Sequence, residues 1–180
     1  SVLRAAPRTF PASNGPRMPK VIHVVRKFVP SEWGGTETHL VNLVRELSRL
    51  GWTSEVHAPA EPGTDGSPLE QVGASFRTYR ASYPYWRLDP RQRATLVASG
   101  GNLFSFDEVW RLASDRRASI VHAHAIGRLG GIVRFGARLR RTPYAVTLHG
   151  PVRANSEVVR QDVARRGASM TDLGAPLGWL

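Results

Sequence analysis

Short apolar runs alternate with amphipathic segments along most of the chain. The runs at residues 20–25, 54–58, 74–79, 119–123 and 144–148 are apolar or alternate apolar with polar positions, which is typical of strands in a buried sheet. Longer segments between them repeat apolar residues every three or four positions and predict helices. Because strands and helices alternate, the pattern favours an α/β domain. We expect a doubly wound, mainly parallel sheet with helices on both faces.

The strongest helix pattern follows a pair of glycines, Gly34 and Gly35. Its apolar stripe consists of Leu40, Leu43, Val44, Leu47 and Leu50. Thr36 is expected to cap the start of this helix, and Glu37 lies well against the positive end of the helix dipole. Gly51 is expected to end the helix.

Two further helices are predicted in the second half of the chain. Ser105 and Glu108 have the spacing of a capping box, in which each side chain satisfies a free backbone N–H of the other. The helix that they open has one apolar face, which contains Phe106, Val109, Trp110 and Ala113. The next helix has an apolar face with Leu129, Ile132, Val133, Gly136 and Leu139. Pro143 is expected to stop it, and residues 155–167 are weakly helical in pattern.

The charge balance of the 180-residue chain is strongly basic. Lys and Arg number 25 and Asp and Glu number 14, which gives a net charge of +11. This balance favours an anionic partner, such as a nucleic acid, a membrane surface or a phosphorylated substrate. Arginine enrichment can also reflect a GC-rich genome, which explains the positive charge equally well. No RNP-like, helix-turn-helix or zinc-finger signature is present, so we do not expect nucleic acid to be the partner.

Composition also limits the possible cellular locations of the protein and its number of domains. The absence of cysteine excludes disulfides, thiolate catalysis and cysteine zinc sites, and is compatible with a cytoplasmic protein. No apolar run approaches the roughly 18 residues that span a bilayer. Residues 1–19 carry arginines without an acid and lack the apolar stretch of a secretory signal. We therefore expect a mobile basic tail over 1–19, with a transit peptide as the weaker alternative because such peptides are also Arg-rich and acid-poor. We expect one domain over 20–180, cut at its C-terminal end from a longer protein.

Candidate site residues follow the predicted strands. In a doubly wound sheet, ligands bind beyond the carboxyl ends of the strands. Gly34 and Gly35 follow the first strand and directly precede a helix N-terminus, where free N–H groups attract phosphate or carboxylate. The pair matches neither of the common nucleotide-binding glycine motifs, and an ordinary turn into a helix is an equal alternative.

Histidines mark the ends of two later strands. His122 and His124 alternate on a strand and so point to the same face, a spacing that can hold a metal. A zinc site needs at least three protein ligands, and the sequence shows no third one, so we expect no metal. His149 and Gly150 follow the last strand. His149 has the position of a general acid or base or of a ligand for a substrate hydroxyl, and a structural histidine is an equal alternative.

Two segments together resemble a known enzyme family. Residues 21–58 read VIHVVRKFVPSEWGGTETHLVNLVRELSRLGWTSEVHA, and residues 120–150 read IVHAHAIGRLGGIVRFGARLRRTPYAVTLHG. The first is similar to the opening of the retaining GT-B glycosyltransferases of family 4, and the second to their later strand–helix–strand pattern with H-x-H and T-x-H-G. The resemblance is weakest over 60–118. It implies a Rossmann-like domain that forms the N-terminal, acceptor-binding half of a two-domain enzyme.

The resemblance implies a sugar transfer from a nucleotide-sugar donor to a glycan, lipid-linked or small-molecule acceptor, with no metal or other cofactor. Gly34, Gly35, Thr36 and Glu37 would form the loop that approaches the donor, and His149 would contact the transferred sugar. His124 and Gly150 would lie nearby. The donor-binding domain is absent from these 180 residues, so the chain alone should be inactive. We expect a cytoplasmic protein, with a position at the inner face of the membrane as a second expectation. The alternative is a non-catalytic module whose arginines bind a nucleic acid or a membrane.

Overall fold

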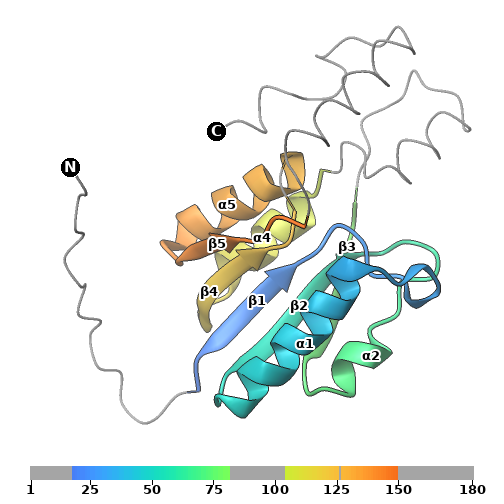
Figure 1. Ribbon diagram of the computed structural model, residues 1–180. Coiled ribbons are helices and arrows are strands. Elements are labelled where there is room, and N and C mark those ends of the chain that lie inside the picture. Colours follow the sequence, from blue (N-terminus) through green and yellow to red (C-terminus); the bar gives the residue numbers. More distant parts are fainter. Residues whose placement is uncertain (1–17, 82–103, 126, 150–180) are drawn as a thin grey trace, which may run out of the picture.

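The computed structural model describes residues 18–81, 104–125 and 127–149. Their strands form one parallel sheet with the order β3-β2-β1-β4-β5. The strands are β1 (Lys20–Val24), β2 (Thr53–Pro59), β3 (Ser75–Tyr79), β4 (Ala118–Ala123) and β5 (Tyr144–Val146). All five predicted strands are confirmed within one or two residues at each end, and the predicted parallel sheet is confirmed (Figure 1).

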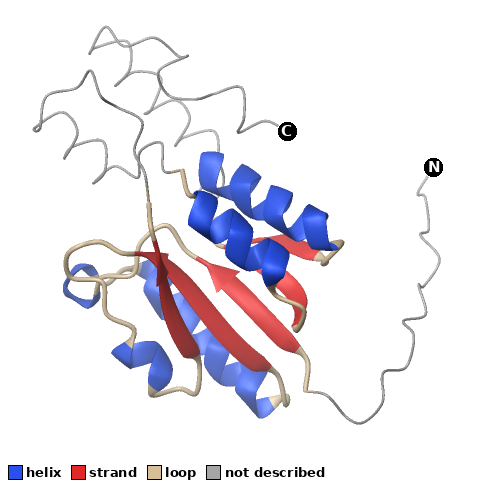
Figure 2. Ribbon diagram, turned by 180° about the vertical axis from the view of Figure 1, so that it is seen from behind, coloured by secondary structure: helices blue, strands red, loops and turns tan. Residues whose placement is uncertain are grey.

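Helices cover both faces of the sheet, as predicted. The helix α1 (Gly35–Arg49) and the short α2 (Ser67–Glu70) lie on one face, after a 3-10 turn η1 (Pro30–Glu32) (Figure 1). On the opposite face lie α4 (Phe106–Ser114) and α5 (Arg128–Arg140) (Figure 2). The described residues include no helix that is long and apolar enough to cross a bilayer.

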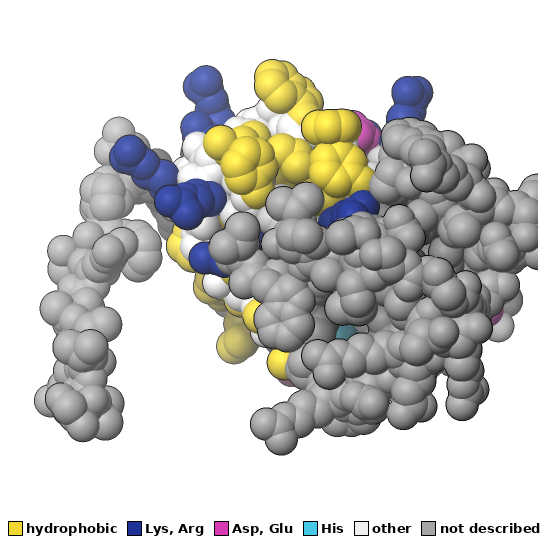
Figure 3. All heavy atoms as spheres, turned by 90° about the horizontal axis from the view of Figure 1, so that it is seen from above, with side chains coloured by type: hydrophobic (Ala, Val, Ile, Leu, Met, Phe, Trp, Pro, Cys, Tyr) yellow, Lys and Arg dark blue, Asp and Glu magenta, His cyan; other side chains and the backbone are white. Residues whose placement is uncertain are grey.

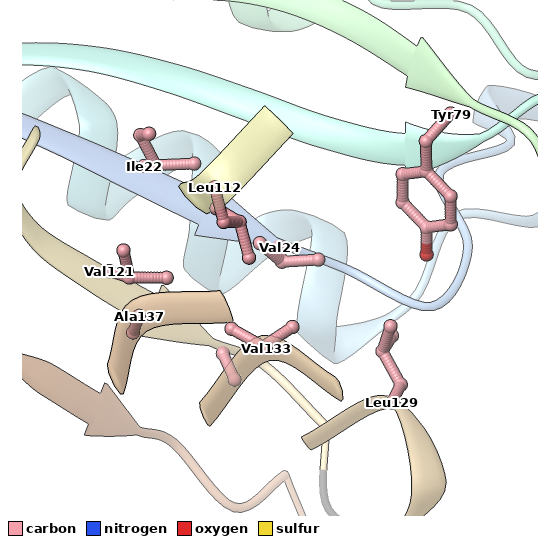
Figure 4. Packing of buried hydrophobic residues seen from close by; sticks show 9 residues of the cluster. Ile22, Val24, Tyr79, Leu112, Val121, Leu129, Val133 and Ala137 are labelled. Atoms are coloured by element: carbon pink, nitrogen blue, oxygen red, sulfur yellow. The ribbon is translucent and has the colours of Figure 1, made fainter. Parts of the chain in front are cut away.

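The strands divide their side chains between two cores because successive residues point to opposite faces. Ile22 and Val24 of β1 and Val121 of β4 pack against α4 and α5 (Figure 4). The other core, under α1 and α2, contains Val25, Phe28, Leu40, Val41, Val44, Val56, Ala58, Leu69 and Ala74. This alternation also sends His23 of β1 to the α1 face, which matters for the site described below.

The start of α1 differs from the sequence expectation. Gly34 is the N-cap, and Thr36 lies inside the first turn, so the prediction that Thr36 caps the helix is wrong. The carboxylate of Glu37 accepts a hydrogen bond from the Gly34 N–H at 3.0 Å, which fixes the start of the helix two residues earlier. The predicted end is confirmed, because Leu50 is the C-cap and Gly51 follows with a left-handed φ of 77°.

The apolar face predicted for α4 is not its buried face. Phe106 and Trp110 are 78% and 72% exposed, and Leu112 and Glu108 are buried instead. The reason is the close approach of α4 to α5, where a Cβ on Gly136 would lie 2.9 Å from the Leu112 Cβ. In α5 the predicted face is buried except for Leu139, which is 56% exposed.

A buried group of charged side chains joins α4 to the sheet. The Ser105 Oγ accepts a hydrogen bond from the Glu108 N–H at 3.0 Å, as the capping box predicted. The Glu108 carboxylate does not return to Ser105, however, but lies 2.8 Å from the Nδ1 of His57. The Nε2 of His57 lies 2.8 Å from the Glu55 carboxylate. A single imidazole therefore lies between two carboxylates.

The charges of this group stabilise one another. Burial alone would lower the pKa of His57, but the hydrogen bonds to Glu108 and Glu55 outweigh it and raise this pKa to about 9. The hydrogen bond from His57 lowers the pKa of Glu55 to about 2, against the effect of burial and with help from Lys20. At neutral pH, His57 is therefore a buried cation and Glu55 a buried anion.

Several expectations concern residues outside those described. These are most of the basic tail, Gly150 and the weakly helical segment 155–167. The short helix α2, which begins at Ser67, has Pro68 in its first turn, a position where the missing N–H of proline is tolerated.

Candidate functional site at the carboxyl edge of the sheet

Five of the six histidines gather on the α1 side of the sheet, towards the carboxyl ends of β1, β4 and β5. His23 of β1 and His122 of β4 are opposite each other in the parallel register, and His124 follows two residues later on the same face. His149 follows β5, and His39 comes from the first turns of α1. We call these five residues the histidine cluster.

Three rings of the histidine cluster form a hydrogen-bonded chain. The Nδ1 of His23 lies 3.1 Å from the Nε2 of His124, and the Nδ1 of His124 lies 3.1 Å from the Nε2 of His149. His23 is fully buried and His149 is exposed. The chain therefore connects the interior of the domain to its surface through ring nitrogens.

The remaining two histidines border this chain. The Nε2 of His122 shares a hydrogen bond of 2.7 Å with the Thr147 hydroxyl, and its ring centroid is 4.2 Å from that of His124. The ring of His39 lies edge-on to His149, with centroids 5.1 Å apart. Side chains from three strand ends and one helix thus contact one another in a small volume.

The surroundings of four histidines in the cluster favour the neutral form of the ring. Burial, and then repulsion from neighbouring histidines, lowers the pKa of His23 to about 3 and that of His124 to about 2. Burial and the same neighbours also lower the pKa values of His122 and His149, although Glu37 opposes the shift at His149. At neutral pH, each of these rings can donate one hydrogen bond and accept another.

The glycine turn lies at the start of α1, on the same side of the sheet. A Cβ on Gly35 would meet no atom within 4 Å, so the space beside it is open. The backbone of Gly34 is extended rather than left-handed, so its conformation alone does not demand glycine. The hydroxyl of Thr38 donates to the Gly34 carbonyl at 2.9 Å, and the Trp33 Nε1–H donates to that hydroxyl. Side chains on both sides therefore hold the turn.

The fold brings most of the predicted site residues together. Glu37 influences the pKa of His149, and His124 bonds to it, so these residues are neighbours across the α1 side of the sheet. Thr36 lies in the first turn of α1, and Gly150 lies outside the described residues. These contacts do not test the roles that the resemblance implies.

Sequence reasoning missed His23 and His39. A signal for His23 was present, because it is the polar residue within the apolar run VIHVV. Its partner could not be identified without the register of β1 against β4. His39 occupies an exposed position in α1, where polar residues are expected, and only the position of the helix over the sheet brings it to His149.

Hollows elsewhere on the surface do not coincide with this site. One of about 280 Å³ lies beside Glu55, His57 and Trp110, on the α4 side of the sheet. Another of about 520 Å³ lies beside Met18, Lys20 and Thr53, at the amino ends of the strands. Because doubly wound sheets bind ligands at the carboxyl ends, we take the histidine cluster and the glycine turn as the candidate site.

Comparisons with known proteins identify the family of the chain. The family described as "Glycosyl transferase 4-like domain" matches residues 34–175, a match that begins at the glycine turn. No match was found among curated proteins. A similar solved structure, described as "Crystal Structure Analysis of the Glycotransferase of kitacinnamycin", is 18% identical with a TM-score of 0.47. The alignment covers 84% of this chain and 37% of that one, so the chain spans little more than a third of that protein. Because the family match covers well over half of the residues, the chain belongs to the glycosyl transferase 4-like domain family.

Proposed function

We propose that the chain is the acceptor-binding half of a retaining glycosyltransferase, which moves a sugar from a nucleotide-sugar donor to a glycan, lipid-linked or small-molecule acceptor. The observation that carries the proposal is that Glu37, which bonds to the glycine turn, is also close enough to His149 to act on its pKa at the carboxyl edge of the sheet. Membership of the family supports it. The donor class, the acceptor class and the stereochemistry are parts of the proposal.

The glycine turn is suited to the donor's phosphates. The open space beside Gly35 lets a ligand approach the first turn of α1 without meeting a side chain. The Gly34 N–H is already taken by Glu37, so the N–H groups of Gly35 and Thr36 are the ones assigned to an anion. The negative charge of Glu37 limits how much further negative charge can bind at the turn. Its hydrogen bond to the Gly34 N–H fixes the geometry of the turn.

His149 is suited to a sugar hydroxyl. It is exposed, and its lowered pKa favours a neutral ring that can both donate and accept a hydrogen bond. Its Nε2 is held by His124, which leaves Nδ1 for the ligand. In this proposal His149 contacts the transferred sugar, and His124 positions its ring.

The other wall of the cleft would be a donor-binding domain. We expect the isolated chain to be inactive, because the groups that hold the leaving nucleotide belong to that domain. The proposal is tested on the chain itself by titration with glucose 1-phosphate, which carries the sugar and phosphate of a donor.

In this titration we expect binding in the millimolar range. Changes in two-dimensional NMR spectra should be confined to the amides of Gly35 and Thr36 and to the ring of His149. The amides of α2 serve as an internal control. Unperturbed signals at the glycine turn, or turnover of a nucleotide sugar by the isolated chain, would contradict the proposal.

A second part of the proposal concerns location: we propose a cytoplasmic protein that lies against the inner face of the membrane. The exposed surface of α4 and α5, here called the α4–α5 face, carries apolar and basic residues. They are Phe106, Trp110, Phe135, Leu139, Arg134, Arg138 and Arg140. Seen from above, apolar side chains gather at the surface with basic side chains beside them (Figure 3). The α5 part of this face contains no acidic residue, and in α4 Asp107 is paired with Arg111 while Glu108 is buried. The α4–α5 face is therefore complementary to an anionic lipid surface.

Vesicle flotation tests this location. The chain should float with vesicles that contain phosphatidylglycerol and not with pure phosphatidylcholine vesicles. Each arginine near an anionic surface contributes about 1 kcal/mol, so replacing both Arg138 and Arg140 by Gln should weaken binding about 30-fold. Trp110→Ala should also weaken it, whereas the matched control Trp33→Ala, on the α1 side, should not. Equal flotation with both lipids, or salt-sensitive binding of nucleic acid without vesicle binding, would refute the idea.

A further inference from the structure

Three members of the histidine cluster are arranged as metal ligands. His122 is on β4, His124 directly follows this strand two residues later, and His23 is opposite His122 on the neighbouring strand. Each offers one ring nitrogen, and these three nitrogens lie within 4.8 Å of one another. Two ligands alternating on one strand and a third on its neighbour place all three donors above the same face of a sheet.

The distances are close to those of a tetrahedral site. Zinc–nitrogen bonds of 2.0–2.1 Å place the ligand nitrogens about 3.4 Å apart. The Nδ1 of His23 and the Nε2 of His124 are already 3.1 Å apart. The third nitrogen, from the half-buried His122, lies within 4.8 Å of the other two.

The ligand atom of His23 is its Nδ1, which faces the Nε2 of His124. With an ion at Nδ1, the hydrogen of this fully buried ring is on Nε2, which has no hydrogen-bond partner among the described residues and is not part of the ligand set.

We propose that His23, His122 and His124 bind one divalent transition-metal ion of the zinc class, with water as the fourth ligand. Three imidazoles with no carboxylate or sulfur in the ligand set suit Zn²⁺, Co²⁺, Ni²⁺ or Cu²⁺, and not Mg²⁺ or Ca²⁺. The site needs neither a sugar nor a second domain, so it goes beyond the proposed function and stands or fails independently of it.

Neighbouring groups orient two of the three ligands. The Thr147 hydroxyl bonds to the Nε2 of His122, which leaves Nδ1 as the ligand atom of that ring. The Nε2 of His149 lies opposite the Nδ1 of His124, which leaves Nε2 of His124 as the ligand. Metal-binding histidines commonly use their second nitrogen in this way, and the contact fixes the orientation of the ring.

The test uses the full chain without an affinity tag, after dialysis against a chelator. Calorimetric titration with ZnCl₂ should give one ion per chain with a dissociation constant of about 1 µM or tighter. Titration with CoCl₂ should give the intense visible absorption of four-coordinate cobalt and paramagnetically shifted ring signals from three histidines. Mg²⁺ should give neither. The absence of one-to-one Zn²⁺ binding, or a cobalt spectrum of six-coordinate type, overturns the proposal.

Variants identify the ligands. His122→Gln should weaken Zn²⁺ binding by at least about 100-fold, a larger effect than the loss of an outer contact. The glutamine can keep a hydrogen bond to Thr147, so the fold should persist, which circular dichroism checks. His39→Gln is the matched control, because this histidine belongs to the cluster but not to the three ligands, and it should leave the affinity unchanged. Unchanged affinity in folded His122→Gln, or an equal loss in His39→Gln, overturns the assignment. If His122→Gln does not fold, the ligands are counted from the shifted histidine signals of the unmodified chain with CoCl₂: three support the assignment, and any other number overturns it.

Discussion

Replacing His57 by Gln is expected to lower the free energy of unfolding by about 3–5 kcal/mol, because it removes one partner of a buried ionic group. The imidazole of His57 lies 2.8 Å from a carboxylate oxygen of both Glu55 and Glu108. Glutamine cannot carry the positive charge that both carboxylates need. Glu108 is fully buried, and its second oxygen has no hydrogen-bond partner among the described residues. Water therefore cannot solvate the Glu108 carboxylate once His57 is removed.

The same group makes stability depend on pH, and the sign follows from the pKa shifts. The pKa of His57 is raised from 6.5 to about 9, so its contribution is complete below pH 6.5 and is lost as the pH rises through 9. The pKa of Glu55 is lowered from 4.5 to about 2, so its contribution is complete above pH 4.5 and is lost as the pH falls towards 2. Stability should therefore be highest between about pH 4.5 and 6.5, and His57→Gln should remove the decline on the alkaline side.

Urea denaturation followed by circular dichroism, repeated from pH 5 to pH 9.5, measures both effects. His39→Gln is the control, because it removes an exposed histidine outside the ionic group. A double variant, His57→Gln with Glu108→Gln, should recover part of the lost stability, since it removes one of the stranded charges. A loss below about 1 kcal/mol for His57→Gln would show that the imidazole is not a charged partner of the two carboxylates.

Replacing His149 by Ala is expected to reduce sugar transfer by about 10²–10⁴-fold, the range for a side chain that transfers or shares a proton with the reacting group. The variant is measured in a protein in which the chain is joined to a donor-binding domain of the same family. His149 is exposed, and the contact seen for its Nε2 is with His124, so its removal should leave the fold intact. The loss should appear mainly in kcat if His149 acts in the transition state, and in KM if it only binds the sugar.

Leu148→Ala is the matched control, since Leu148 is an exposed neighbour on the same segment. If Leu148→Ala reduces kcat as strongly as His149→Ala, the segment rather than the imidazole matters. If transfer is unchanged in His149→Ala, the assignment of His149 to the sugar is wrong, and the glycine turn becomes the remaining candidate.

The sequence predicted the sheet well because its signals are local. A strand such as β1 is a short apolar run, and α1 has a regular stripe that ends at a glycine. The apolar face of α4 was misjudged because its rotation depends on a contact with another helix. Gly136 of α5 lets Leu112 approach closely, and Glu108 is drawn to His57 by charge. Neither partner is near α4 in the sequence, so periodicity alone points to the wrong face.

The candidate site was predicted in part for the same reason. His124 and His149 end predicted strands, and the rule that ligands bind at carboxyl ends places both at one edge. His23 became visible as their partner only when the register of β1 against β4 was known. The same register places His23 beside His122, which gives the proposed metal site the third ligand that the sequence did not show. Pairing between strands about 100 residues apart is information that no local pattern contains.

The chain of rings from His23 through His124 to His149 has a direction. Each neutral imidazole carries one hydrogen, so the two bonds of the chain must point the same way: both hydrogens towards the surface, or both towards the interior. A hydroxyl that donates to His149 selects one arrangement, and one that accepts from it selects the other. An ion held by the lone pair of the His124 Nε2 would leave the hydrogen on Nδ1, where it is donated to His149, and His149 would then present an N–H outward. The orientation of a sugar hydroxyl at the surface and the occupancy of a metal site in the interior are therefore coupled through the hydrogen that His124 shares with His149.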